Sequence, residues 1–195
     1  ISCEKYNGNF IISVNDFYSG ICKVVISESG KNLVDNIFDN LEEIKTEYNF
    51  SVKSSELDNG EHHYIIEVTD NAGNEKIYEQ FIYVDKEKPN GNISIEGPDG
   101  KEINGELWFD KNDIITVRVN ADQDLSGLDE VIIYINNKEF IFKGDQIIKD
   151  KNGYYVKVNT NDLIYNDEHK YQISGSLIDV AQNTFNLKPL TVYID

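Results

Sequence analysis

The side chains in this sequence that could do chemistry are mainly carboxylates in turn-like segments. Calcium ions take six to eight oxygen ligands from carboxylates, amides and backbone carbonyls, and adaptable acidic loops supply such ligands. The spacing does not match an EF-hand loop, and the alternative reading is that these carboxylates are solvated turn residues. The residues that we predict as calcium ligands are Asp85, Glu87, Asp122, Asp124 and Asp179.

Catalytic groups are hard to nominate from the same sequence. Two of the three histidines, His62 and His169, occupy matching positions in the segments EHHY (61–64) and EHKY (168–171). We therefore expect these histidines to be structural, capping a strand or bonding a loop carbonyl. No Ser, His and Asp set recurs, no carboxylate pair stands out from the many others, and no glycine-rich loop opens a helix. The sequence predicts that the protein is not an enzyme and has no catalytic residues.

Two adjacent aromatic pairs are candidate binding residues. Trp108 precedes Phe109, and Tyr154 precedes Tyr155. Aromatic rings can stack on sugars or anchor a protein interface, so we consider Trp108 and Tyr155 as ligand-binding residues. Neighbours in a strand point to opposite faces, so one member of each pair is expected to face the core. The alternative is that both pairs serve as core edges or loop anchors.

Charge and composition exclude several classes of partner. The 195 residues include 35 acidic and 18 basic side chains, a formal net charge of −17. A negative field of that size repels nucleic acid and anionic membranes. No stretch approaches the roughly 20 apolar residues of a membrane helix. We expect no nucleic-acid partner and no membrane insertion, and the abrupt start at Ile1 suggests a fragment of a longer chain.

The chain contains two cysteines, Cys3 and Cys22. So few cysteines indicate neither a disulfide framework nor a zinc site. They form one bridge between early strands, or they are two buried thiols that pack as small hydrophobic side chains.

Apolar residues alternate with polar ones along most of the chain, as in half-buried β-strands. The segment NFIISVND places Phe10, Ile12 and Val14 on one face, and DIITVRVNA does the same with Ile115 and Val117. Clusters of Gly, Asn and Asp separate these runs, and no segment has a sustained helical period. The pattern predicts an all-β fold.

An internal repeat organises the chain into two copies of one unit. Matching landmarks recur in the same order, and their offset drifts only from 106 to 110 residues. The matched segments are 16–27 with 124–135, 48–57 with 154–163, 61–64 with 168–171, 70–74 with 179–183, and 81–85 with 191–195.

The two copies meet in the charged segment VDKEKPNGN (84–92), where Pro89 and Gly91 stop a strand. We place domain one at 1–86 and domain two at 87–195. Domain two is longer because of the segment 97–113, which has almost no counterpart in domain one.

The segment DNAGN (70–74) lies between the last two predicted strands of domain one. Asp70 can accept backbone N–H bonds in a turn, and Gly73 can adopt the positive φ of a tight hairpin. Domain two has Gln182 in place of this glycine, so we expect its loop to be longer or differently shaped. Gly175–Ser176 is expected to be an insertion or a β-bulge.

About seven short strands per roughly 100 residues is the count of an immunoglobulin-like (Ig-like) domain. We therefore predict two tandem Ig-like antiparallel β-sandwiches. In such a domain the loops at one pole lie beside the entering chain. That pole of domain two would gather the five predicted calcium ligands and join the two domains, and Asp16 and Asp70 lie at the matching pole of domain one.

The landmarks resemble the bacterial Ig-like (Big-type) repeats of secreted and cell-surface proteins from low-GC Gram-positive bacteria. The residues that carry the resemblance are Asp16 with Ser19-Gly20-Ile21, Gly60 with His62 and Tyr64, Asp70-Asn71-Ala72-Gly73-Asn74, Val84-Asp85 with Pro89, and Gly100, Asn104-Gly105 and Trp108-Phe109. The resemblance covers nearly the whole chain and departs from the family pattern at Gly175-Ser176 and Ala181-Gln182. It implies the Ig-like fold, and some related repeats hold calcium at their junctions.

This resemblance implies a non-catalytic spacer or adhesion module of an exported protein, holding other domains away from the cell wall. The alternatives are a module that binds a glycan or a host surface protein, and an accessory region of a secreted hydrolase. The expected partners are neighbouring domains of the same chain, and the chain is expected to be a monomer.

Overall fold

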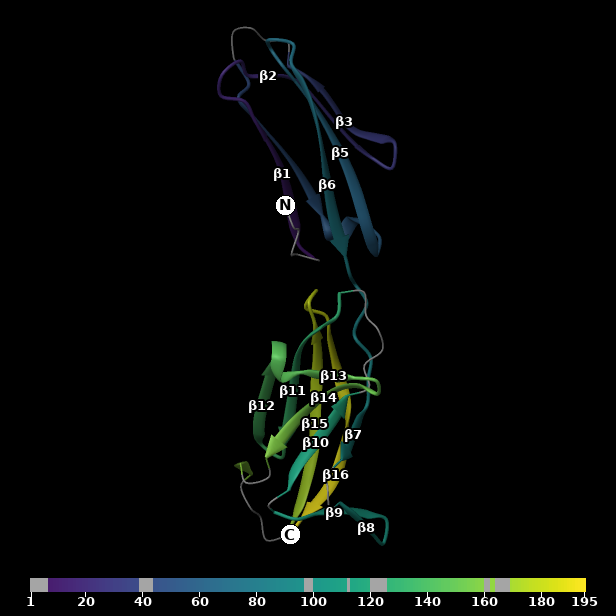
Figure 1. The fold of residues 1–195 in the computed structure, drawn as a ribbon. Coiled ribbons are helices and arrows are strands. Elements are labelled where there is room, and N and C mark those ends of the chain that lie inside the picture. The colour runs from purple at the N-terminus through teal and green to yellow at the C-terminus, as the bar shows by residue number, and fades with distance from the viewer. Residues whose placement is uncertain are drawn as a thin grey trace. The chain divides into compact units, whose positions relative to one another are not determined.

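The computed structural model describes residues 7–38, 44–96, 100–111, 113–119, 126–159, 162–163 and 169–195. Cys3, Asp122 and Asp124 lie outside these ranges, so the predictions that involve them remain predictions. The chain divides into two compact units, residues 1–86 and 87–195, which are described separately below (Figure 1).

Unit 1 consists of two antiparallel sheets that face each other across a core. One sheet pairs β1 (Asn9–Asn15) with β4 (Glu47–Lys53). The other has the order β3-β2-β5-β6, and a short 3-10 helix, η1 (Ser54–Glu56), follows β4. The bounds of its strands are β2 (Ile21–Glu28), β3 (Lys31–Ile37), β5 (Gly60–Asp70) and β6 (Glu75–Val84).

Unit 2 also has two sheets, in the orders β13-β14-β10-β7 and β12-β11-β15-β16-β9-β8. The first contains β7 (Ile93–Glu96), β10 (Ile114–Val119), β13 (Ile148–Asp150) and β14 (Gly153–Asn159). The second contains β8 (Lys101–Ile103), β9 (Glu106–Phe109), β11 (Leu128–Ile135), β12 (Lys138–Lys143), β15 (Lys170–Asp179) and β16 (Thr184–Ile194), with the 3-10 helix η2 (Gly144–Gln146) after β12. The predicted all-β sandwich fold is confirmed.

The alternation of apolar residues puts one face of each strand into a core. Ile115 and Val117 of β10 are fully buried in unit 2. In unit 1, Phe10, Ile12 and Val14 of β1 all pack against the core, and Val14 is the most buried of the three. The faces predicted from the period of two are therefore confirmed. Each fully buried aliphatic side chain contributes about 1.5–3 kcal/mol to the free energy of unfolding.

The expected irregularity at Gly175 is a β-bulge. The pairing of β15 with β16 changes register between Ile173 and Gly175. A side chain at Gly175 would collide with the backbone carbonyl of Ile132 on the neighbouring strand. Glycine is therefore needed here because the two backbones approach closely, and the bulge prediction is confirmed.

Part of the extra segment of unit 2 forms the hairpin β8–β9, which extends the larger sheet. Strand β9 runs parallel to the end of β16 and pairs Trp108 with Tyr193 and Phe109 with Ile194. Phe109 is buried in the core, and the Trp108 ring stacks on the Tyr193 ring at a centroid distance of 4.8 Å. One member of this aromatic pair faces the core, as predicted.

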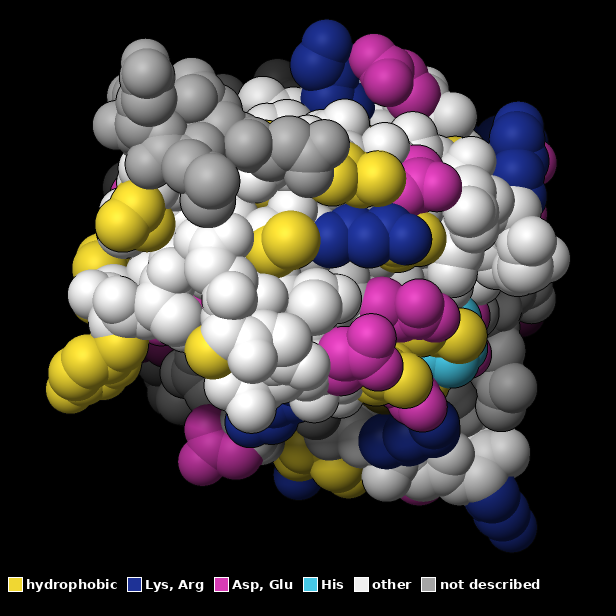
Figure 2. All heavy atoms as spheres, turned by 90° about the horizontal axis from the view of Figure 1, so that it is seen from above, with side chains coloured by type: hydrophobic (Ala, Val, Ile, Leu, Met, Phe, Trp, Pro, Cys, Tyr) yellow, Lys and Arg dark blue, Asp and Glu magenta, His cyan; other side chains and the backbone are white. Residues whose placement is uncertain are grey.

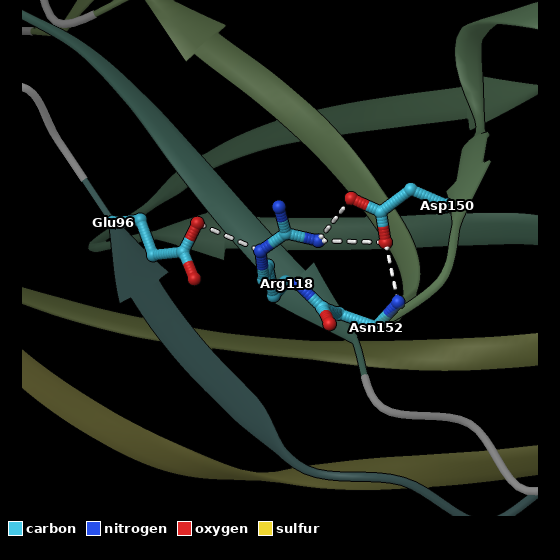
Figure 3. A network of polar contacts seen from close by, with 4 residues as sticks. All are labelled: Glu96, Arg118, Asp150 and Asn152. Atoms are coloured by element: carbon cyan, nitrogen blue, oxygen red, sulfur yellow. Dashed lines mark hydrogen bonds and ion pairs between the residues drawn. The ribbon is translucent and has the colours of Figure 1, made fainter.

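The outer face of the smaller sheet of unit 2 carries a charged network around Arg118, the single arginine of the chain (Figure 3). Its Nε donates to Glu96 at 2.7 Å, and its Nη1 donates to the Asp150 carboxylate at 3.1 and 3.3 Å. Asp150 also accepts the Asn152 backbone N–H at 2.8 Å, and that bond, with the Arg118 contact, lowers the pKa of the Asp150 carboxyl. The network therefore ties β7, β10 and the β13–β14 turn together.

Replacing Arg118 with lysine should lower the thermal midpoint of unit 2 by a few degrees, because a compact ammonium group lacks the planar, widely spaced donors with which the guanidinium reaches Glu96 and Asp150 at once. The fluorescence of Trp108, the one tryptophan in the chain, reports the unfolding of unit 2. Lys143→Arg is the matched control, since the Lys143 side chain is 61% exposed in its pair with Glu130. Equal midpoints for Arg118→Lys and the unchanged protein would contradict this role.

Candidate binding loops of unit 1

The turn between β5 and β6 is held by the side chain of Asp70. One carboxylate oxygen accepts the Asn74 backbone N–H at 2.7 Å, and the other accepts the Asn74 side-chain amide at 2.7 Å. The Gly73 N–H donates to the Asp70 carbonyl at 3.1 Å, and Gly73 has a φ of +86°. The bonds from Asn74 lower the pKa of the Asp70 carboxyl. The predicted roles of Asp70 and Gly73 are confirmed.

The corresponding turn of unit 2 has the same bonds. Asp179 accepts the backbone N–H and the side-chain amide of Asn183 at 2.7 and 2.8 Å. Gln182 donates its N–H to the Asp179 carbonyl at 3.0 Å and adopts a φ of 70°. The expectation that Gln182 would lengthen or reshape this loop is therefore wrong. The shared bonds hold Gln182 in the left-handed conformation, and this conformation costs an L-residue roughly 1–2 kcal/mol.

The loop between β1 and β2, residues 16–20, is fixed against the β5–β6 turn. The Ser19 hydroxyl lies 2.7 Å from an Asp16 oxygen and 3.0 Å from an Asp70 oxygen. Asn71 donates its side-chain amide to the Ser19 carbonyl at 2.8 Å and its backbone N–H to the Gly20 carbonyl at 3.0 Å. We call residues 16–20 and 70–74 the apical loops of unit 1.

The apical loops hold two aromatic side chains out in solvent. Phe17 is 74% exposed and Tyr18 is 100% exposed. The Tyr18 backbone N–H nevertheless bonds the Asp16 carboxylate at 2.9 Å. The Ser19 hydroxyl bond and this contact lower the pKa of the Asp16 carboxyl. Figure 2 views the molecule from above the upper end of Figure 1 and shows hydrophobic side chains scattered on that surface among charged and other groups. The backbone under the two rings is ordered by hydrogen bonds.

The fold does not require these aromatic rings. In the predicted repeat, Ser126-Gly127 of the second copy aligns with Ser19-Gly20 of the first. The residues before Ser126 are Asp124 and Leu125, where unit 1 has Phe17 and Tyr18. Sequence reasoning overlooked this pair, although a comparison of the two copies at these positions would have found it.

The residues predicted as calcium ligands lie in different surroundings. Asp85 is fully buried in unit 1, where its carbonyl accepts the Asn7 amide at 2.6 Å, whereas Glu87 is an exposed residue of unit 2. Both carboxylate oxygens of the buried Asp179 bond Asn183. Within the described ranges, no group of three His, Cys, Asp or Glu side chains is arranged to hold a metal ion.

The aromatic residues predicted to bind a ligand contact other side chains of unit 2. Tyr155 pairs with Arg118 across the sheet, and the guanidinium lies 4.8 Å from its ring centroid. Its neighbour Tyr154 lies opposite the buried Val119 and therefore on the inner face of the sheet. Trp108 is half-buried against Tyr193. Both predicted residues keep part of their ring surface accessible.

Two histidines bond backbone carbonyls, as expected of structural residues. The ring nitrogens of His62 lie 2.8 Å from the Asp58 carbonyl and 2.6 Å from a Glu28 carboxylate oxygen. His169 approaches the Ile194 carbonyl at 3.0 Å. Partial burial alone would lower the pKa of His62, but the Asp58 and Glu28 contacts outweigh it and raise that pKa above 6.5.

No protein-family model and no curated protein matches this chain. Solved structures do match it. The fibronectin(III)-like modules of Clostridium thermocellum CbhA align over 97% of this chain and 86% of theirs, at 11% identity and a TM-score of 0.43. Murine CEACAM1b aligns over 98% of this chain and 94% of its own, at 9% identity and a TM-score of 0.46.

A Ca²⁺-stabilized adhesin with which an Antarctic bacterium binds ice also aligns with this chain. The alignment covers 97% of this chain and 45% of the adhesin chain, at 18% identity and a TM-score of 0.42. This chain thus spans less than half the length of that adhesin structure. Within its described part, none of the helices of the present chain has the length and apolar character needed to cross a membrane.

Exchanging the residue at the left-handed position should change the stability of the two units in opposite directions. Gln182→Gly should raise the free energy of unfolding of unit 2 by about 0.5–1 kcal/mol, because glycine adopts positive φ without strain. Gly73→Gln should destabilise unit 1, although nothing lies within 4 Å of a side chain added there. Denaturant unfolding of both variants measures the effect, and a destabilised Gln182→Gly protein would refute this account.

Unit 1 should lose stability as the pH rises through neutrality. The folded-state pKa of His62 is raised, so the protonated form stabilises the fold below pH 6.5, and this contribution disappears as the pH passes the folded-state pKa. An NMR titration of His62 should therefore give a pKa above 6.5, the ordinary value. Glu28→Gln should bring it back toward that value. A folded-state value at or below 6.5 would show that burial dominates instead.

Proposed function

We propose that this chain is a non-catalytic adhesion and spacer module of an exported cell-surface protein. The observation that supports adhesion is the exposure of Phe17 and Tyr18 on a loop whose backbone is fixed by hydrogen bonds. Rigid aromatic side chains supply a large contact area at a low cost in conformational entropy. We propose a glycan or a host surface protein as the ligand of the apical loops.

The spacer role is proposed from the architecture. The order β3-β2-β5-β6 in unit 1 recurs as β12-β11-β15-β16 in unit 2, and both copies of the Asp turn have the same bonds. These likenesses support two tandem copies of one bacterial Ig-like repeat, which would add length between other domains of a monomeric, secreted chain. The role of accessory region in a secreted hydrolase fits the same architecture and predicts no activity in this chain.

The Phe17→Ser/Tyr18→Ser double variant tests the adhesion proposal. The unchanged chain should bind a member of a glycan array or of a panel of purified extracellular host proteins in a saturable manner. The double variant should bind that ligand at least about tenfold more weakly, as expected when exposed aromatic anchors are removed. Both side chains are exposed, so the variant should keep the thermal midpoint of the unchanged protein.

Matched variants separate the apical loops from the other candidate residues. Trp108→Ala and Tyr155→Ala remove the two aromatic residues that sequence patterns nominated, and both should leave binding intact. Ile37→Ser removes an apolar side chain that is 59% exposed on β3 of unit 1 and should also leave binding intact. Binding lost in Trp108→Ala or Tyr155→Ala, but kept in the double variant, would move the binding site to unit 2.

Calcium remains our proposal for the acidic residues Asp85, Glu87, Asp122, Asp124 and Asp179. Because both oxygens of Asp179 already accept bonds from Asn183, a site in unit 2 needs carboxylates besides Asp179. The other predicted ligands in unit 2 include Asp122 and Asp124, which are close to each other in the sequence. Backbone carbonyls and water would complete the six to eight oxygen ligands of a calcium ion.

Millimolar calcium should raise the thermal midpoint of the chain above that measured in EDTA, because binding to the folded state alone adds RT ln(1 + [L]/Kd) to its stability. A saturated site corresponds to a shift of several degrees for a domain of about 100 residues. Asp124→Asn should abolish the shift, and magnesium serves as the control ion. An identical midpoint in EDTA and calcium would leave these carboxylates as turn and surface residues.

A further inference from the structure

Strand β6 of unit 1 is an open sheet edge with an apolar surface. It is 10 residues long, and in the described part of the chain only β5 pairs with it. Ile77, Tyr78 and Phe81 are 64%, 48% and 37% exposed. Consecutive strand residues point to opposite faces, so Ile77 and Tyr78 leave apolar surface on both sides of the edge. A long open edge of this kind is a template for another strand.

The equivalent strand of unit 2 is protected. Strand β9 pairs with the end of β16, and Pro189 removes one backbone donor from the middle of that strand. None of the large apolar side chains of β16 is among the exposed ones. The other edge of the unit 1 sheet, β3, pairs with β2 through an irregular register between Ile26 and Ser27. β3 also exposes apolar side chains, Leu33 at 40% and Ile37 at 59%, so β6 differs from it in its length of 10 residues and in its regular pairing with β5.

One face of the β6 edge has a distinct chemical pattern. Glu75, Ile77, Glu79 and Phe81 follow one another on it, because they are two residues apart. A shallow, mainly polar hollow of about 130 Å³ lies on the sheet over β2, β5 and β6, on the side of β6 away from the open edge. The residues that line the hollow include Lys23, Val25, Glu67, Thr69, Glu75 and Ile77.

The charges select the kind of strand that fits. Glu75 and Glu79 flank Ile77. Glu79 lies 3.2 Å from His63 Nε2 but keeps 61% of its side chain exposed, so an added strand gains most when cationic side chains lie opposite the two glutamates and an apolar one lies between. A second copy of this chain is a poor partner, since each copy has a formal net charge of −17. Antiparallel self-pairing centred on Glu79 would also place like charges opposite each other.

We propose that the open edge of β6 binds an extended, basic segment of a partner polypeptide as an added antiparallel strand. Backbone hydrogen bonds to β6 supply affinity, and the alternation of cationic and apolar side chains supplies specificity. β6 begins at Glu75, directly after the apical turn 70–74, but the proposed edge does not include Phe17 or Tyr18 and would be a second binding surface of unit 1. The inference does not depend on the ligand of Phe17 and Tyr18.

Fluorescence anisotropy with the labelled peptide Ile-Thr-Lys-Val-Val-Glu-Lys, designed to lie antiparallel to residues 75–81, tests the proposal on the whole chain. We expect saturable binding that weakens about tenfold or more in Ile77→Lys, which places a cation in the middle of the edge. Ile141→Lys is the matched control, since Ile141 is 49% exposed on β12 of unit 2. Glu79→Pro copies the proline of β16 and should also block binding.

Two further peptides identify the mode of binding. In the first, alternate backbone nitrogens of the peptide are methylated, which removes hydrogen-bond donors without changing the charge and should abolish binding. In the second, both lysines of the peptide are replaced by glutamate, which should also abolish binding. Binding that survives backbone methylation would overturn the added-strand proposal, and so would failure of the original peptide to bind.

Other occupants of the edge give distinct results. A dimer in sedimentation that Ile77→Lys dissociates would assign β6 to a second copy and overturn the proposal. Peptide binding that requires removal of residues 1–6 would assign the edge to the chain's own first residues, with the same consequence. A monomeric chain that binds the peptide with residues 1–6 present supports the proposal.

Discussion

The arrangement of both sandwiches depends on one carboxylate in the turn before the last long strand. Asp70 in unit 1 and Asp179 in unit 2 each accept a backbone N–H and a side-chain amide from an asparagine four residues later. A charged acceptor strengthens both bonds, and the turn sets the register of the two longest strands of its sheet. Because the turn is closed by side chains, the left-handed position tolerates Gln182 as well as Gly73.

The same carboxylate links the turn to the loop that faces it in unit 1. Ser19 lies between Asp16 and Asp70, and Asn71 bonds the loop backbone. This small network consists of short polar side chains, so the sandwich core remains apolar while its end carries an ordered loop. Phe17 and Tyr18 are therefore presented to solvent without the flexibility that would weaken a binding surface. Folding and the proposed adhesion depend on the same hydrogen bonds.

Much of the fold could be predicted from the sequence because strand faces, bulges and tight turns are determined by residues close together in the chain. The alternation of Ile115 and Val117 predicts a buried strand face, Gly175 indicates a bulge, and Asp70 with Gly73 predicts a tight turn. The Gln182 loop was mispredicted because local preference favours glycine there, whereas bonds between Asp179 and Asn183 decide the conformation. The network of Arg118 was also missed, since it joins strands whose register the sequence does not reveal.

Native-state hydrogen exchange of backbone amides, compared between the unchanged chain and Asp70→Ala, tests the role of the turn carboxylate most directly. The Asn74 amide should be protected in the unchanged chain and should exchange much faster in Asp70→Ala. Exchange should also quicken at Tyr18 in the facing loop, while Asn183 in unit 2 stays protected. Equal protection of Asn74 and Tyr18 with and without the carboxylate would contradict the account.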